Sequence, residues 1–70
     1  MVIDTTAPEG NIFAALGIAA RFMKQAHRDK ADIDALRTKV MQAKSYQAAC
    51  EAITDATFGS IAFYTPGEDE

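Results

Sequence analysis

Few side chains in this sequence are of the types that carry out catalysis. His27 is the one histidine and Cys50 the one cysteine, so a thiol–imidazole pair is the simplest nucleophilic dyad open to the chain. Such a pair works when a third group orients the imidazole, and no such group stands out in the sequence. We therefore interpret His27 as a boundary residue near a helix C-terminus and Cys50 as a small buried hydrophobic residue.

The remaining chemical signals are weak. Two acidic pairs, Asp32 with Asp34 and Glu51 with Asp55, are typical of solvated helix surfaces. One histidine and one cysteine do not make a zinc site, and no phosphate-binding loop or dinucleotide fingerprint is present. A chain of 70 residues also has little room for a substrate pocket beside its core. The sequence therefore predicts a protein that is not an enzyme and has no cofactor or metal.

The composition predicts one small domain covering residues 1–70. The chain is 49% hydrophobic, which is enough to form a core. A single cysteine allows no internal disulfide, so self-association as a homodimer is a further way to bury surface. The N-terminus lacks the pattern of a signal peptide, and the most apolar helical stretch is too short to span a bilayer. We expect a cytoplasmic protein with no membrane contact.

The longest helical pattern runs from Asn11 to Arg28, and we expect the rest of the chain to pack around it. Two start signals compete: a capping box formed by Thr6 and Glu9, and Asn11 as the N-cap directly after a glycine. At about 100° per residue, apolar side chains cover more than half of this helix, so it needs neighbours on more than one side. The apolar arc comprises Ile12, Ala15, Leu16, Ala19, Phe22, Met23 and Ala26, extended by Phe13, Ile18 and Ala20.

Two further helices follow. Asp29 is expected to cap a second helix, which the short connection makes antiparallel to the first. Ser45 is a good N-cap for a third helix that ends near Thr57, with Gly59 at the position after its C-cap.

Short strands are expected at both ends. The β-branched and aromatic segments 1–6 and 60–65 predict strands that pair within one chain or between two copies, with Ile3 pointing inward. The predicted fold class is α+β, with a three-helix core and short N- and C-terminal strands (β-α-α-α-β). Residues 66–70 form a predicted acidic tail. The predicted core is Ile12, Leu16, Ala19, Phe22, Met23, Ile33, Leu36, Val40, Ile53 and Phe63.

Charge is unevenly distributed along the chain. Residues 21–44 contain all seven Lys and Arg with three Asp, a balance of +4, whereas the remaining residues carry −7. Arg21, Lys24 and Arg28 share one face of the first helix, either as a solvated face or as a docking stripe for an acidic partner. We name these three residues the basic stripe and take them as the candidate protein-binding residues.

These features favour a protein-interaction module with a protein partner, and three surfaces are offered: a strand edge, the basic stripe, and an acidic surface from the third helix and tail. The alternative is a nucleic-acid-binding regulator, because residues 11–43 have the layout of a helix-turn-helix. The sequence pI of about 4.9 and three aspartates at the start of the would-be recognition helix argue against nucleic acid.

A motif at the N-terminal end carries a resemblance. A short strand, then T-x-P-E-G-N-x-F, a glycine four residues later and a basic helix end resemble a group of small uncharacterised proteins of bacteriophages and prophages. The resemblance implies a setting: such proteins bind and redirect or inhibit host proteins, including defence systems, in the host cytoplasm. It implies no site residues. The matching residues are Thr6, Pro8, Glu9, Gly10, Asn11, Phe13 and Gly17.

Overall fold

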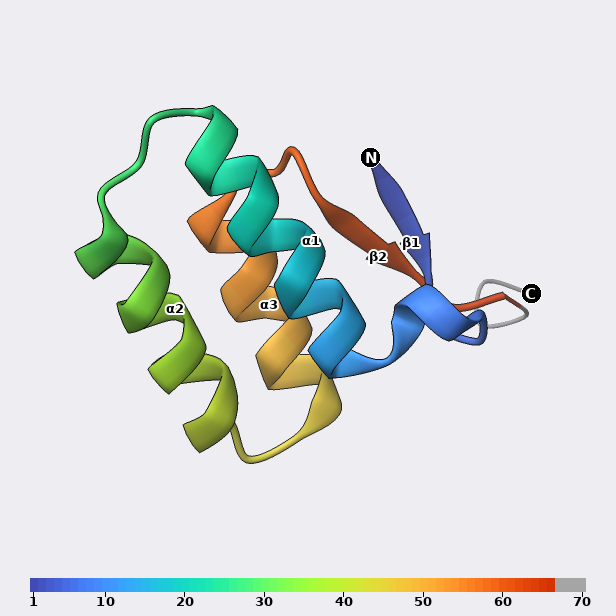
Figure 1. The fold of residues 1–70 in the computed structure, drawn as a ribbon. Helices are drawn as coiled ribbons and strands as arrows, with labels where there is room; N and C mark the ends of the chain where they lie inside the picture. Colours follow the sequence, from blue (N-terminus) through green and yellow to red (C-terminus); the bar gives the residue numbers. More distant parts are fainter. Residues whose placement is uncertain (67–70) are drawn as a thin grey trace.

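Three helices separate two short strands in the computed structural model, which describes residues 1–66 (Figure 1). This confirms the predicted α+β class with its β-α-α-α-β order.

The predicted acidic residues 68–70 of the tail lie outside the described residues. Within residues 1–66, no helix is long and apolar enough to cross a membrane. The elements are β1 (Val2–Asp4), the 3-10 turn η1 (Pro8–Gly10), α1 (Ile12–Gln25), α2 (Lys30–Gln42), α3 (Tyr46–Ala56) and β2 (Ala62–Tyr64).

The two strands pair in parallel within one chain, with Ile3 opposite Phe63. Each helix runs opposite to the element before it, so three successive helices bring β2 back parallel to β1 (Figure 1). Because side chains alternate along a strand, Ile3 and Phe63 share the inner face of the sheet. Ile3 is buried there, whereas Val2 and Tyr64 on the outer face are exposed. The sheet therefore covers one side of the helices and leaves its other face to solvent.

Side-chain caps determine where two of the helices begin. Asn11 Oδ1 accepts a hydrogen bond from the backbone amide two residues later at 2.9 Å, so Asn11 is the N-cap of α1. The alternative capping box of Thr6 and Glu9 is wrong, since that segment ends in η1, which has no side-chain cap. The cap at Ser45 is confirmed: its Oγ accepts from the amide three residues later at 3.1 Å. Asp29 occupies the N-cap position of α2 without a side-chain hydrogen bond.

Two helices end with a bulky residue in the left-handed conformation. His27 follows the C-cap of α1 with φ 61°, and Phe58 follows the C-cap of α3 with φ 55°. In both cases the next amide donates to the carbonyl five residues earlier at 2.9 Å, which is the Schellman arrangement. Gly59 is thus one residue beyond the position that the sequence predicted for it. Both sites carry the steric cost that non-glycine residues incur in this region.

The core lies between the three helices and the inner face of the sheet. The apolar arc of α1 is wider than its neighbours can cover, so Phe13 is 65% exposed. Half of the predicted core, on α1 and on other elements, lies at the periphery. The predicted residues that are buried are Ala19, Met23, Leu36, Val40 and Ile53. Those that are half-buried and pack against them are Ile12, Leu16, Phe22, Ile33 and Phe63. The buried core also contains Ile3, Ala15, Ala49, Ala52 and Ile61, which that set did not include.

The difference between buried and peripheral leucines can be measured. Leu36→Ala should lower the free energy of unfolding by about 2–5 kcal/mol, because it leaves a cavity between helices. Leu16→Ala should cost less, because Leu16 is only half-buried. Urea unfolding monitored by circular dichroism measures both. Equal losses of unfolding free energy in the two variants would show that α1 and α2 pack into the core differently from this structure.

The left-handed residue at the end of α3 provides a second test. Phe58→Gly should be more stable than Phe58→Ala by about 1 kcal/mol, because both lose the ring but only glycine relieves the steric cost at positive φ. Comparing the two variants removes the contribution of the ring itself. Thermal and urea unfolding give the difference, and identical midpoints would contradict a left-handed conformation at this position in solution.

Candidate functional site

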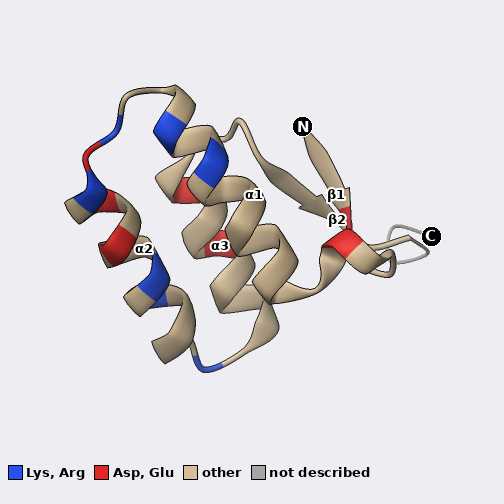
Figure 2. Cartoon of the chain, viewed as in Figure 1, with Lys and Arg blue, Asp and Glu red and all other residues tan. Residues whose placement is uncertain are grey.

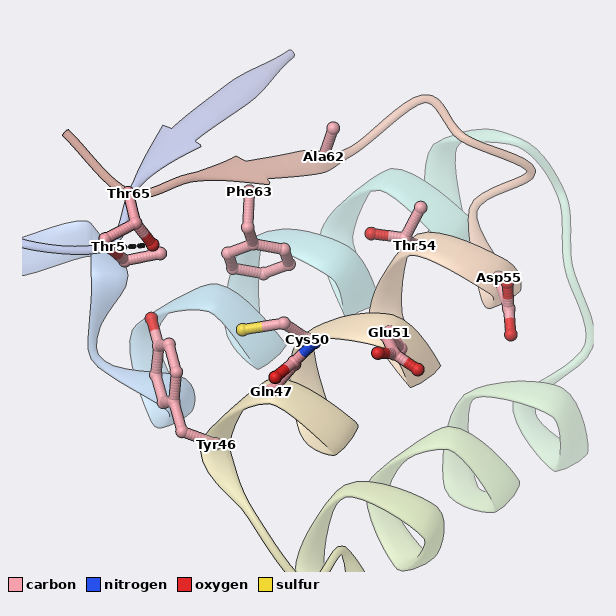
Figure 3. Close-up of a pocket in the computed structure, with 10 residues that line it drawn as sticks. All are labelled: Thr5, Tyr46, Gln47, Cys50, Glu51, Thr54, Asp55, Ala62, Phe63 and Thr65. Carbon is pink, nitrogen blue, oxygen red and sulfur yellow. Dashed lines mark hydrogen bonds between the residues drawn. The ribbon is translucent and has the colours of Figure 1, made fainter. Parts of the chain in front are cut away.

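A groove of about 500 Å³ lies between α3 and β2 (Figure 3). Phe63 points from β2 toward α3, and the Cys50 thiol points toward the rings of Phe63 and Tyr46. Glu51 and Asp55 line the side formed by α3. The other lining residues are Thr5, Gln47, Thr54, Ala62 and Thr65. The groove thus has apolar and polar walls and opens to solvent, as a binding site for a polypeptide segment requires.

One end of the groove is held by Tyr46. Its hydroxyl donates to the carbonyl oxygen of Gly10, which joins the first residue of α3 to the turn before α1. A side chain at Gly10 would place a Cβ 2.5 Å from the carbonyl oxygen of Thr5, so this close approach requires glycine. Burial raises the pKa of Tyr46, and the adjacent Cys50 thiol raises it further. The Tyr46 hydroxyl therefore stays protonated and keeps its hydrogen bond.

Threonine hydroxyls fix β2 at both ends. Thr57 is fully buried, and its Oγ1 donates to the Ile53 carbonyl at 2.9 Å and accepts from the Ile61 amide at 3.2 Å. This bridge sets the position at which the chain leaves α3 and enters β2. At the other end, the Oγ1 atoms of Thr5 and Thr65 are 2.9 Å apart and hydrogen-bonded (Figure 3).

The outer edge of β2 borders this groove. Ala62 N donates to the Met1 carbonyl and the Tyr64 carbonyl accepts from Thr5 N, both at 2.9 Å, so these groups point toward β1. The N–H and C=O of Phe63, which lies between them, consequently point to the opposite edge. The sheet of the described residues has only two strands, so no strand within residues 1–66 pairs with this edge. An unpaired donor and acceptor therefore lie beside the groove.

The charge lining the groove is negative. Glu51 and Asp55 are the charged residues of this groove, and both acids also line the adjacent groove between α2 and α3, together with Lys39 and Lys44. Among residues 1–66, the one ion pair within 4.0 Å joins Arg28 to Asp32. Neither acid of the groove is thus neutralised by direct contact with a cation in the described part of the chain. The sequence predicted this pair as solvated helix residues and offered the acidic surface of the third helix and tail as a candidate docking surface, but nothing in the sequence shows which strand lies beside the pair.

The structure divides the basic stripe. Arg21 and Lys24 lie in α1 and are exposed, and Figure 2 shows basic residues in the second half of this helix. Arg28 is instead partly buried: its Nη1 donates to the Ala56 carbonyl at 3.0 Å, and its guanidinium carbon is 4.9 Å from the centre of the Phe58 ring. Arg28 therefore connects the end of α1 to the end of α3, and only the other two residues are fully available to a partner.

The two residues considered for nucleophilic chemistry are not brought together. His27 lies exposed in the connection between α1 and α2, next to Arg28, which contacts the last residue of α3. Cys50 lies in the first half of α3, beside Tyr46 and Phe63 (Figure 3). Burial raises the pKa of the Cys50 thiol, and the negative charge of Glu51 also raises it, whereas the neighbouring Tyr46 hydroxyl lowers it by a smaller amount than burial raises it. The thiol is thus kept in its unreactive, protonated form.

No family model, curated protein or solved structure matches this chain. The resemblance to phage proteins therefore stays a prediction. Two residues of its motif have structural roles in the link between β1 and α1: Gly10 allows the close approach to Thr5, and Asn11 caps α1. The candidate site lies beside this link and is defined by its geometry.

The state of Cys50 can be checked directly. With iodoacetamide at pH 8, the folded protein should be alkylated much more slowly than the same protein in urea, because burial limits access and disfavours the thiolate. The alkylation rate of the folded protein should begin to rise at a higher pH than that of the unfolded protein, because the pKa of Cys50 is raised in the folded state. Mass spectrometry measures the modified fraction, and equal rates in both states would contradict a buried thiol.

Proposed function

We propose that this chain is a non-enzymatic protein-interaction module that binds an extended segment of a partner protein along the outer edge of β2. The observation that carries this proposal is the outward-facing backbone N–H and C=O of Phe63 at the border of the groove. Addition of a strand to a sheet edge supplies affinity through main-chain hydrogen bonds, and the groove below supplies selectivity through side-chain contacts. A third strand would also complete a sheet that is short of strands for independent stability.

The alternative reading as a DNA-binding helix-turn-helix is disfavoured by charge. In that reading α2 is the recognition helix, and its N-terminal residues would approach the nucleic acid. Asp29, Asp32 and Asp34 are exposed at this end of α2, where phosphate contacts need cations. The exposed Arg21 and Lys24 remain a second candidate surface for a protein partner.

The proposed biological setting is that of a small phage accessory protein. A module of this size acts stoichiometrically, by occupying a surface of a host or defence protein and so modulating or inhibiting it. This part of the proposal is supported by the N-terminal motif and its resemblance to phage-carried proteins. The partner's identity would come from the experiment that tests the site.

A backbone modification tests the site without altering its side chains. The chain is short enough to assemble from two synthetic segments joined at Cys50, with an N-methyl group on the amide of Phe63. This change removes the outward donor and blocks the outer edge of β2 but leaves the hydrogen bonds to β1 intact. N-methylation of Val2, at the outer edge of β1, is the matched control. Affinity capture from a lysate of the natural host should yield a partner with the wild type and the control, and not with the Phe63 analogue.

Other outcomes would redirect or refute the proposal. If the Arg21→Glu/Lys24→Glu variant alone loses the partner, the contact surface is the exposed part of the basic stripe. If nucleic acid is captured in place of protein, the interaction-module proposal fails. Circular dichroism of each analogue ensures that only folded proteins are compared.

A further inference from the structure

We infer that the segment bound along β2 is an extended peptide that carries two Lys or Arg residues at alternate positions, preceded by one apolar residue. This inference rests on the proposed function and specifies its ligand. It follows from three features of the groove: the arrangement of its charges, the spacing of its two acids, and the position of its apolar surface.

The first feature is the negative charge that α3 contributes to this groove, which has no Lys or Arg among its lining residues. Glu51 and Asp55 are four residues apart on one helix face, where like charges repel. Asp55 is also in the last turn of α3, where the Arg28 guanidinium donates to the Ala56 carbonyl and so compensates the negative end of the helix dipole. The repulsion between the two acids therefore remains as the effect that disfavours them in the free protein. A cationic side chain in the groove would reduce this repulsion, which gives electrostatic complementarity to a basic ligand.

The second feature is a match of spacing. Four residues of an α-helix rise about 6 Å, and two residues of a β-strand advance by about 6.6 Å. Strand β2 and helix α3 run in roughly opposite directions on the two sides of the groove (Figure 3). A strand added to β2 would therefore present side chains at positions i and i+2 at the spacing of Glu51 and Asp55. Lys and Arg are long enough to extend from the strand to the opposite wall.

The third feature sets the direction of the peptide. The apolar surface, formed by Tyr46, Cys50 and Phe63, lies toward the start of α3, and the two acids follow along the helix. A peptide antiparallel to β2 runs from the apolar end to the acidic end, and antiparallel pairing is the more stable kind. The expected order on the groove side is therefore apolar, basic, basic, with the intervening side chains facing solvent.

Four synthetic octapeptides test this order, each acetylated and amidated. The probe is TVTKTKTS, two charge controls are TVTQTQTS and TVTETETS, and a spacing control is TVKKTTTS, which has the composition of the probe. Titrations are followed by NMR with ¹⁵N-labelled protein. The probe should bind most tightly and should shift the amides of Phe63 and Thr65, with the Glu peptide weakest. Removing the acids with Glu51→Gln/Asp55→Asn should weaken the probe by about two- to fivefold per carboxylate, as for exposed ion pairs, and leave the Gln peptide unaffected.

The outcomes separate this inference from the proposed function. If all four peptides shift the Phe63 amide with equal affinity, the edge of β2 binds extended segments and the inference about charge and spacing is wrong. If the spacing control equals the probe, the alternate placement of cations is wrong. If no peptide binds and N-methylation of Phe63 also leaves partner capture unchanged, both proposals fail. If the wild type dimerises in light scattering and the Phe63 analogue does not, the occupant of the edge is a second copy of the chain and the inference is overturned.

Discussion

The parallel pairing of β1 with β2 is the constraint on which the rest of the structure depends. The paired residues are sixty positions apart, and a parallel arrangement requires the chain to return to the starting end before the second strand begins. Three helices of alternating direction achieve this return (Figure 1). The pairing places Ile3 at the centre of the core and Phe63 above α3. The groove exists because the last strand, rather than another helix, lies beside α3.

Polar contacts at the ends of α3 connect elements that apolar packing alone would leave adjustable. Tyr46 joins the start of α3 to the turn before α1, Arg28 joins its end to the connection after α1, and Thr57 joins it to β2. Each contact includes a backbone carbonyl or amide that a neighbouring element leaves unpaired. In a domain without disulfides, these bonds orient α3 and with it both walls of the groove.

The sequence predicted the element order and half of the core, because these depend on patterns that are local. Asn11 and Ser45 were recognisable as caps, and Ala19, Met23, Leu36, Val40 and Ile53 follow helical periodicity. Periodicity says how apolar a face is but not how many neighbours cover it, which is why Leu16 and Phe22 are only half-buried. Small core residues such as Ala49 and Ala52 carry too little hydrophobic signal to be distinguished from surface alanines.

The candidate site was less accessible to prediction. The strand edge and the acidic face of the third helix were both identified as surfaces, but only the fold places them on either side of one groove. The bond from Tyr46 to Gly10 joins residues 36 apart and has no sequence signal. Arg28 looked equivalent to Arg21 and Lys24 because helix geometry puts all three on one face. The Schellman turn after α1 redirects it toward α3.

The distance along the chain between the paired strands also determines when the sheet can form. Helices and short loops form within microseconds, whereas a ribosome adds about 5–20 residues per second. The residues of β1 therefore wait about 3–12 seconds for their partner to be synthesised, at this rate of elongation. Once it has left the ribosome, Ile3, later fully buried, stays exposed on an unpaired strand until β2 is available. Until then, a chaperone can bind the nascent chain, or its unpaired β1 segment can pair with another chain translated from the same messenger RNA. The sheet is therefore the last part of the fold to form.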